Sequence, residues 1–100
     1  LQIELQRKVI VEEVQAAAQR MASAVRGADL ASQQRDAARD NYKLVDKQAR
    51  LGAITPLEVT NAQAVLTEAE TAFEVAAMER AISVYDYMFA IGTLDLGGKR

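Results

Sequence analysis

The stretch that decides the fold is Leu51-Gly52-Ala53-Ile54-Thr55-Pro56-Leu57-Glu58-Val59. Gly52 can adopt the left-handed conformation that closes a helix just after its last turn. The run Thr55-Pro56-Leu57-Glu58 is a capping box for a following helix, with proline at the favoured first helical position. Ile54 and Val59 stand at the two positions of a hydrophobic staple. The sequence therefore predicts one helix ending before this stretch, a turn over residues 51–55, and a second helix beginning at Pro56.

The residues before the turn repeat every seven positions. One row is apolar throughout: Ile3, Ile10, Ala17, Ala24, Ala31, Ala38 and Val45. A companion row four residues further on is apolar at five of seven positions: Arg7, Val14, Met21, Ala28, Arg35, Tyr42 and Ala49. A heptad seam of this length predicts one long helix over residues 2–50. Because the seam is rich in alanine, we expect the partner helix to approach closely; Gly27 is either tolerated in this helix or marks such an approach.

The residues after the turn repeat the pattern. Apolar residues follow alternating spacings of three and four at Val59, Ala62, Leu66, Ala69 and Phe73. A second apolar row, shifted in phase, continues at Ala77, Ala81, Val84, Met88 and Ile91. These rows predict a helix over residues 56–91 with a local unwinding of the supercoil, followed by a tail over 93–100.

A turn this short between two long helices predicts an all-α fold, a long antiparallel two-helix hairpin (coiled coil) over residues 1–92. In this register the numbers of facing residues add up to about 107. Residues 1–50 have a balance of +2 and residues 51–100 a balance of −4, which suggests that opposite charges face each other. The pairs expected on this basis are Arg39 with Glu68, Arg35 with Glu70 and Glu74, and Arg26 with Glu79. Since two helices bury only one side of each other, we expect the isolated chain to form a homo-oligomer.

The composition excludes several classes of function. The 100 residues include no cysteine and no histidine, which removes disulfides, thiolate metal sites and the commonest general base. The carboxylate pairs Glu12/Glu13, Asp36/Asp40 and Glu68/Glu70 fit a solvated helix surface. No apolar run approaches the length of a membrane-spanning helix, and no basic stripe is interleaved with aromatic residues. We therefore expect no enzyme activity, no cofactor, no metal and no nucleic-acid partner. A cluster of Tyr85, Tyr87 and Phe89 is expected to pack in a core or between subunits.

Residues 49–63 and a later run, Tyr87-Met88-Phe89-Ala90-Ile91-Gly92-Thr93-Leu94, carry a family resemblance. With the glycine turn, the acidic position 58, Asn61-Ala62-Gln63 and the alanine-spaced helix before them, the chain from about residue 12 to residue 94 resembles the TolC-like outer-membrane efflux proteins. The chain begins at Leu1 without a methionine or a signal-peptide pattern, so we expect it to be a piece of a longer protein.

The resemblance implies a hairpin from the periplasmic α-helical barrel of a homotrimeric duct in the outer membrane of a Gram-negative cell envelope. It implies that the hairpin tip, Arg50, Leu51, Gly52, Ala53, Ile54 and Thr55, docks a periplasmic adaptor (membrane-fusion) protein. Glu58 falls where an acidic residue lines the pore constriction, and Asn61 stands where some members have a second acid.

Two alternatives of other classes stay open. One is a small secreted helical hairpin of about 100 residues like the WXG-type export substrates, although the chain contains no tryptophan. The other is a structural coiled-coil scaffold without a role in transport.

Overall fold

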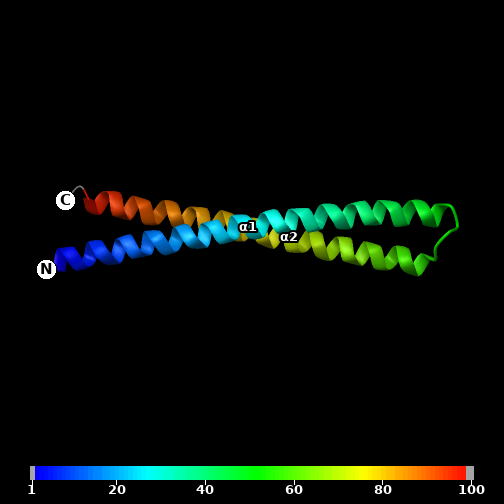
Figure 1. Cartoon of the computed structure of the whole chain (residues 1–100), viewed down its shortest axis with the longest axis horizontal. Coiled ribbons are helices and arrows are strands. Elements are labelled where there is room, and N and C mark those ends of the chain that lie inside the picture. The colour runs from blue at the N-terminus through cyan, green and yellow to red at the C-terminus, as the bar shows by residue number, and fades with distance from the viewer. Residues whose placement is uncertain (1, 99–100) are drawn as a thin grey trace. The chain divides into compact units, whose positions relative to one another are not determined.

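The computed structural model describes residues 2–98 of the chain. They form two helices, α1 (Gln2–Arg50) and α2 (Pro56–Gly98), which run antiparallel and are joined by residues 51–55 (Figure 1). The predicted all-α helical hairpin is therefore confirmed. The chain divides into unit 1, formed by Leu1–Arg26 and Ala77–Arg100, and unit 2, formed by Gly27–Ala76.

A Schellman motif ends α1 at the predicted glycine. The N–H of Gly52 donates to the carbonyl of Ala49 at 3.0 Å, and the N–H of Ala53 donates to the carbonyl of Gln48 at 2.9 Å. Gly52 has a φ of 76°, which is the left-handed conformation that this motif requires. The two bonds satisfy carbonyls that the last turn of a helix would otherwise leave without a partner.

Thr55 caps the start of α2 as predicted. Its hydroxyl oxygen accepts a hydrogen bond from the N–H of Glu58 at 3.4 Å, and its carbonyl accepts one from the same N–H at 3.1 Å. Among the described residues, no reciprocal bond joins the Glu58 carboxylate to the N–H of Thr55, so half of the predicted capping box is present. Ile54 and Val59, the predicted staple pair, are both half-buried and line the same hollow.

Thr55→Ala removes the hydroxyl acceptor of this cap, and we expect it to lower the free energy of unfolding by about 1 kcal/mol. Thermal unfolding followed by circular dichroism measures the change. Thr71→Ala is the matched control, because Thr71 is exposed within α2 and its hydroxyl bonds only the carbonyl of Thr67. That variant should be neutral or slightly stabilising. An equal loss of stability in both variants would contradict the role of Thr55 as a cap.

The seam between the helices is built from small side chains. The buried residues are Ala17 and Ser83 in unit 1, and Ala28, Ala31, Ala38 and Ala62 in unit 2. No large side chain is fully buried among the described residues. The predicted heptad rows of α1 are buried or half-buried from Ile10 to Ala49, whereas Ile3 is 71% exposed. Gly27 is exposed, and a Cβ added there would meet no atom within 4 Å, so this glycine is tolerated and marks no close approach.

The shifted row predicted for the second half of α2 agrees with the structure only in part, since Ala77 and Val84 are half-buried. The spacing of three and four from the first half continues instead at Ala76, Ser83, Tyr87, Ala90 and Leu94, with an interruption at the exposed Arg80. Three members of the predicted row are exposed instead, namely Ala81, Met88 and Ile91. In unit 1, Ala17 of α1 and Ala90 of α2 line the same hollow. This part of the seam contains large side chains, Tyr87 and Leu94, as well as small ones, so side-chain size alone does not explain why Met88 and Ile91 are exposed.

The predicted ion pairs between the helices are absent among residues 2–98. Arg35 bonds Asp36 of its own helix at 3.1 Å and places its guanidinium over the ring of Phe73, 4.1 Å from the centroid. The expected carboxylate partners, Glu68, Glu70, Glu74 and Glu79, are all exposed. An ion pair between two exposed side chains adds little free energy, because both charges are already hydrated. Arg35 lies on the seam and packs against its apolar neighbour Phe73 instead. The contact between Arg35 and Phe73 agrees with the predicted register.

The helix α2 extends past its predicted end at Ile91 and continues through Gly92 to Gly98. The Thr93 hydroxyl donates to the carbonyl of Phe89 at 3.0 Å within this extension, and Leu94 is half-buried on the seam. One glycine in a helix costs about 1 kcal/mol relative to alanine, so Gly92 alone does not end a helix whose next turn packs on a partner. The predicted tail over 93–100 is thus helical as far as Gly98, and its residues 99–100 lie outside the described part.

Candidate functional site

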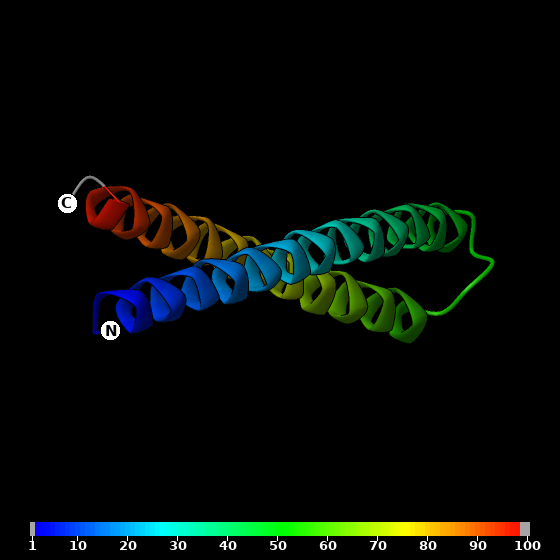
Figure 2. The ribbon, with the colours of Figure 1, turned by 60° about the vertical axis from the view of Figure 1, so that its left-hand side comes forward.

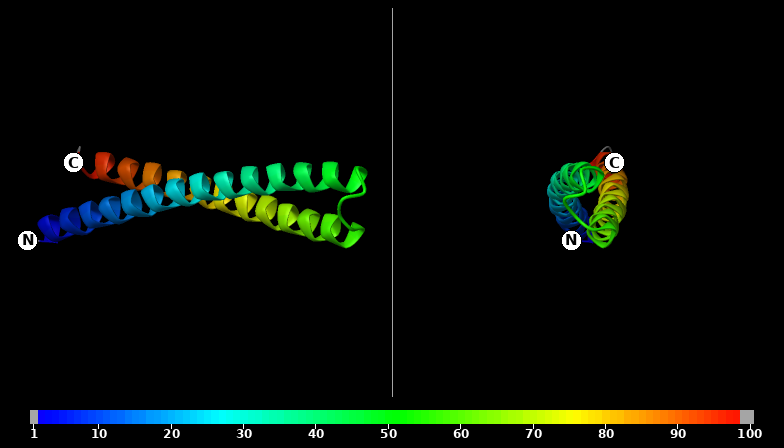
Figure 3. Two further views of the ribbon diagram at one scale, coloured as in Figure 1. Left: turned by 45° about the vertical axis from the view of Figure 1, so that its right-hand side comes forward. Right: turned by 90° about the vertical axis from the view of Figure 1, so that its right-hand side faces the viewer.

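The tip of unit 2 exposes two large apolar side chains. Leu51 is 77% exposed and Leu57 is 68% exposed, on the two sides of the loop. Figures 2 and 3 show the loop crossing from the end of α1 to the start of α2. Gly52, Ala53 and Thr55 are exposed as well. Leu57 was not among the predicted tip residues. Its position inside the capping box, next to Pro56, could have indicated that it lies at the tip.

Ile54 and Arg50 both contact other residues of the tip. Ile54 is half-buried in a shallow hollow of about 460 Å³ beneath the loop, which both helices line. Arg50 lines the same hollow and pairs with Asp46 of α1 at 3.1 Å. The Arg50 side chain is 79% exposed, so this ion pair adds little to stability and leaves the guanidinium open to a partner. The large apolar side chains exposed at the tip are therefore Leu51 and Leu57, whereas Ile54 is half-buried.

The predicted constriction residues lie on the first turns of α2. Glu58 and Asn61 are both exposed, three positions apart on one helix. Among residues 2–98, neither Glu58 nor Asn61 forms a side-chain hydrogen bond or an ion pair with another acidic residue. Both groups are free to face solvent or another subunit.

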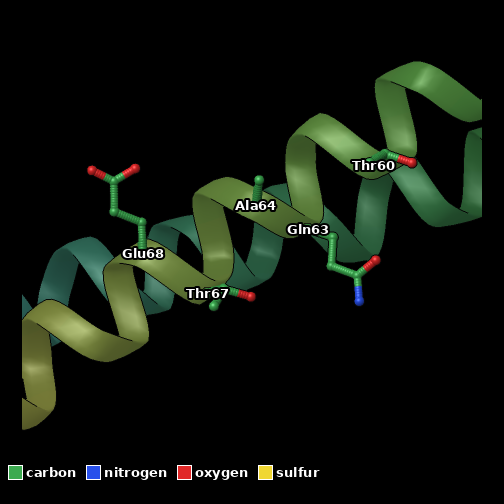
Figure 4. Close-up of a pocket in the computed structure, with 5 residues that line it drawn as sticks. All are labelled: Thr60, Gln63, Ala64, Thr67 and Glu68. Atoms are coloured by element: carbon green, nitrogen blue, oxygen red, sulfur yellow. The ribbon is translucent and has the colours of Figure 1, made fainter.

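A second shallow hollow, of about 490 Å³, lies along α2 beyond the tip. Thr60, Gln63 and Thr67 project from one side of the helix there, and Glu68 projects from the other (Figure 4). The Thr60 hydroxyl donates to the carbonyl of Pro56 at 3.1 Å. This stretch of α2 is a polar surface without an enclosed cavity.

Within residues 2–98, no group of three or more histidine, cysteine, aspartate or glutamate side chains could hold a metal ion. Neither helix, over its described length, has an apolar stretch that could cross a membrane. The predicted aromatic cluster is divided: Tyr87 is half-buried on the seam, whereas Tyr85 and Phe89 are 74% and 79% exposed.

No protein-family model matches the chain, and searches of curated proteins and of solved structures found no match either.

Proposed function

We propose that the chain is a hairpin of the periplasmic α-barrel of a TolC-like efflux duct, in the outer membrane of a Gram-negative envelope. In this proposal its tip docks a periplasmic adaptor protein, and the chain has no catalytic role. The observation that carries the proposal is the left-handed Gly52 in the loop, with Leu51 exposed beside it, where the family resemblance places the adaptor contact. The antiparallel helices and the alanine seam fit the same role.

The exposed tip leucines give the docking step a physical basis. Apolar side chains at a helical tip favour a covering partner, and a glycine without a side chain lets a partner backbone approach closely. The adaptor would meet the tip end to end through the tip of its own coiled coil. One hairpin offers only Leu51, Leu57 and the residues around them, so the contact is small. Affinity would therefore come from several tips engaged at once in a homotrimeric duct.

Conduction through such a duct would be passive. Glu58 would place one carboxylate per copy near the constriction, and the exposed Asn61 amide would lie one turn further along α2. A ring of such carboxylates raises the local concentration of cations and sets the field that a solute meets.

The test is cross-linking of the full-length duct to its adaptor in cells, for the wild type, Leu51→Asp and Leu44→Asp. Leu44 is the matched control because it is a leucine of α1, 55% exposed, away from the loop. We expect the yield of cross-linked adaptor to fall about tenfold for Leu51→Asp, because a charge must then be desolvated in the contact. Trimer yield and membrane insertion should be unchanged in both variants. Normal cross-linking and drug efflux in Leu51→Asp would contradict docking at the tip and favour a coiled-coil scaffold.

A further inference from the structure

The charges on the outer face of α1 change sign near the tip of unit 2. Residues at alternating spacings of three and four lie on one face of a helix. On the face of α1 that points away from the seam, this row consists of Asp29, Gln33, Asp36, Asp40, Lys43, Lys47 and Arg50, and all seven are exposed. The row therefore contains three acids followed by three bases, and the bases are confined to the end of the helix that carries the loop.

The three bases Lys43, Lys47 and Arg50 form what we call the basic patch. The patch is about 10 Å long, because seven residue steps separate its first and last members. Arg50 pairs with Asp46, whereas neither lysine forms an ion pair among residues 2–98. Residues 41–57 contain three bases and one acid, a balance of +2. The tip therefore has an excess of positive charge that the described part of the chain does not neutralise.

The outer face of α2 adds no charge next to the loop. Its exposed residues that point away from the seam there are Leu57, Thr60, Ala64, Thr67 and Thr71. Figure 4 shows Thr60 and Thr67 on one side of α2 and the acidic Glu68 on the other. The outer surface of the tip is thus basic on α1 and uncharged on α2.

The helix dipole explains only part of the basic patch. Basic side chains in the last turn of a helix are favoured by the partial negative charge at its C-terminus, and this effect falls off within one turn. Lys47 and Arg50 lie in the last turn of α1, so the dipole favours both. Lys43 lies seven residues before the end of the helix, so its position on the same face needs another reason.

We propose that the basic patch binds an acidic surface of the protein that docks at the tip, and that Leu51 makes the apolar part of the same contact. This inference rests on the proposed docking and adds the chemistry of the partner, which is a group of carboxylates facing the patch. Leu51 is 77% exposed and directly follows Arg50, whose guanidinium is held by Asp46. Opposite charges around an apolar contact speed association and fix the orientation of the partner.

A protein fits this surface better than a nucleic acid or a membrane does. The basic patch contains no aromatic side chain on which a base could stack. Anionic lipid surfaces are recognised by clusters of roughly four to eight basic residues, and the patch has three. An exposed leucine beside a few charges is the composition of a small protein contact with an apolar centre and a charged rim.

Binding of the purified full-length duct to its adaptor, measured at low and high salt, tests the inference. The variants are Lys43→Glu and Lys47→Glu, and Lys43→Arg keeps the charge. Arg39→Glu is the matched control, because Arg39 is an exposed base of α1 that lies outside the row of the patch. Thermal unfolding should be similar in Lys43→Glu and Arg39→Glu, since exposed charges within a helix contribute little to stability.

We expect Lys43→Glu and Lys47→Glu each to raise the Kd for the adaptor about fivefold at about 50 mM NaCl and less than about twofold at about 300 mM, because salt screens the charges. Lys43→Arg and Arg39→Glu should bind like the wild type at both salt concentrations. Equal Kd values for Lys43→Glu and Arg39→Glu would overturn the inference. So would wild-type binding to phosphatidylserine vesicles that Lys43→Glu abolishes, because the patch would then bind a membrane.

Leu51→Asp separates this inference from the proposed docking. If Leu51→Asp loses the adaptor and Lys43→Glu binds it normally at low salt, docking at the tip stands and the acidic partner surface is refuted. If both variants bind normally, or if the wild type does not bind the adaptor, both proposals are refuted.

Discussion

Enlarging Ala17 to leucine is expected to lower the free energy of unfolding by about 3 kcal/mol. Ala17 is 1% exposed and lies on the seam of unit 1, in a hollow that it shares with Ala90 of α2. Because Ala17 is almost fully buried, an isopropyl group added there must push the helices apart or displace side chains into the adjacent hollow, and either change costs packing free energy. Thermal and urea unfolding of Ala17→Leu against the wild type measures the loss.

Ala37→Leu is the control for this prediction. Ala37 is an exposed alanine of the same helix, so the same enlargement meets solvent and should change stability by less than about 0.5 kcal/mol. If Ala17→Leu were as stable as Ala37→Leu, the close approach of the helices at this position would be refuted.

The sequence was sufficient to predict α1 and its seam. One row of seven positions is apolar at every member, from Ile3 to Val45, and no other row with this spacing in the helix is apolar throughout. In the structure this row is buried or half-buried from Ile10 onward. Both ends of the turn could also be predicted, because left-handed backbone at Gly52 and a cap at Thr55 depend only on neighbouring residues.

The second half of α2 could not be predicted by hydrophobicity alone. Two adjacent rows compete there, and the row that holds Val84, Met88 and Ile91 is more apolar than the row that holds Ser83 and Ala90. The structure keeps the phase of the first half of α2 there, and the row that it buries includes the large side chains of Tyr87 and Leu94 as well as Ser83 and Ala90. Neither hydrophobicity nor side-chain size alone therefore selects the row.

At the tip, the sequence predicted where the loop lies and only part of its surface. Ile54, which the sequence places both in the tip and in the staple, is half-buried and lines the hollow beneath the loop together with Val59. Leu57 provides the second exposed apolar side chain instead. The ion pairs between the helices failed for a related reason, since facing positions do not fix where long exposed side chains lie.

Gly52→Val is expected to destabilise the hairpin by about 2 kcal/mol. Gly52 has a φ of 76°, a conformation that a β-branched residue adopts at a high energetic cost. A Cβ at this position would meet no atom within 4 Å, so the whole cost comes from the backbone and none from a clash. Gly52→Asn should therefore recover most of the loss, because asparagine tolerates left-handed backbone at helix ends. Thermal unfolding of the variants separates the two substitutions.

Gly27 provides a control of opposite sign in the same chain. It lies within α1, is exposed, and has equally open surroundings, but no positive φ is found there. Gly27→Ala should therefore raise the free energy of unfolding by about 1 kcal/mol, because alanine restricts the unfolded chain and favours the helix. Two glycines with the same open space would then respond in opposite directions, and only backbone conformation distinguishes them. If Gly52→Val left the melting temperature unchanged, or if Gly27→Ala lowered it, the Schellman turn at Gly52 and the uninterrupted helix at Gly27 would each have to be reconsidered.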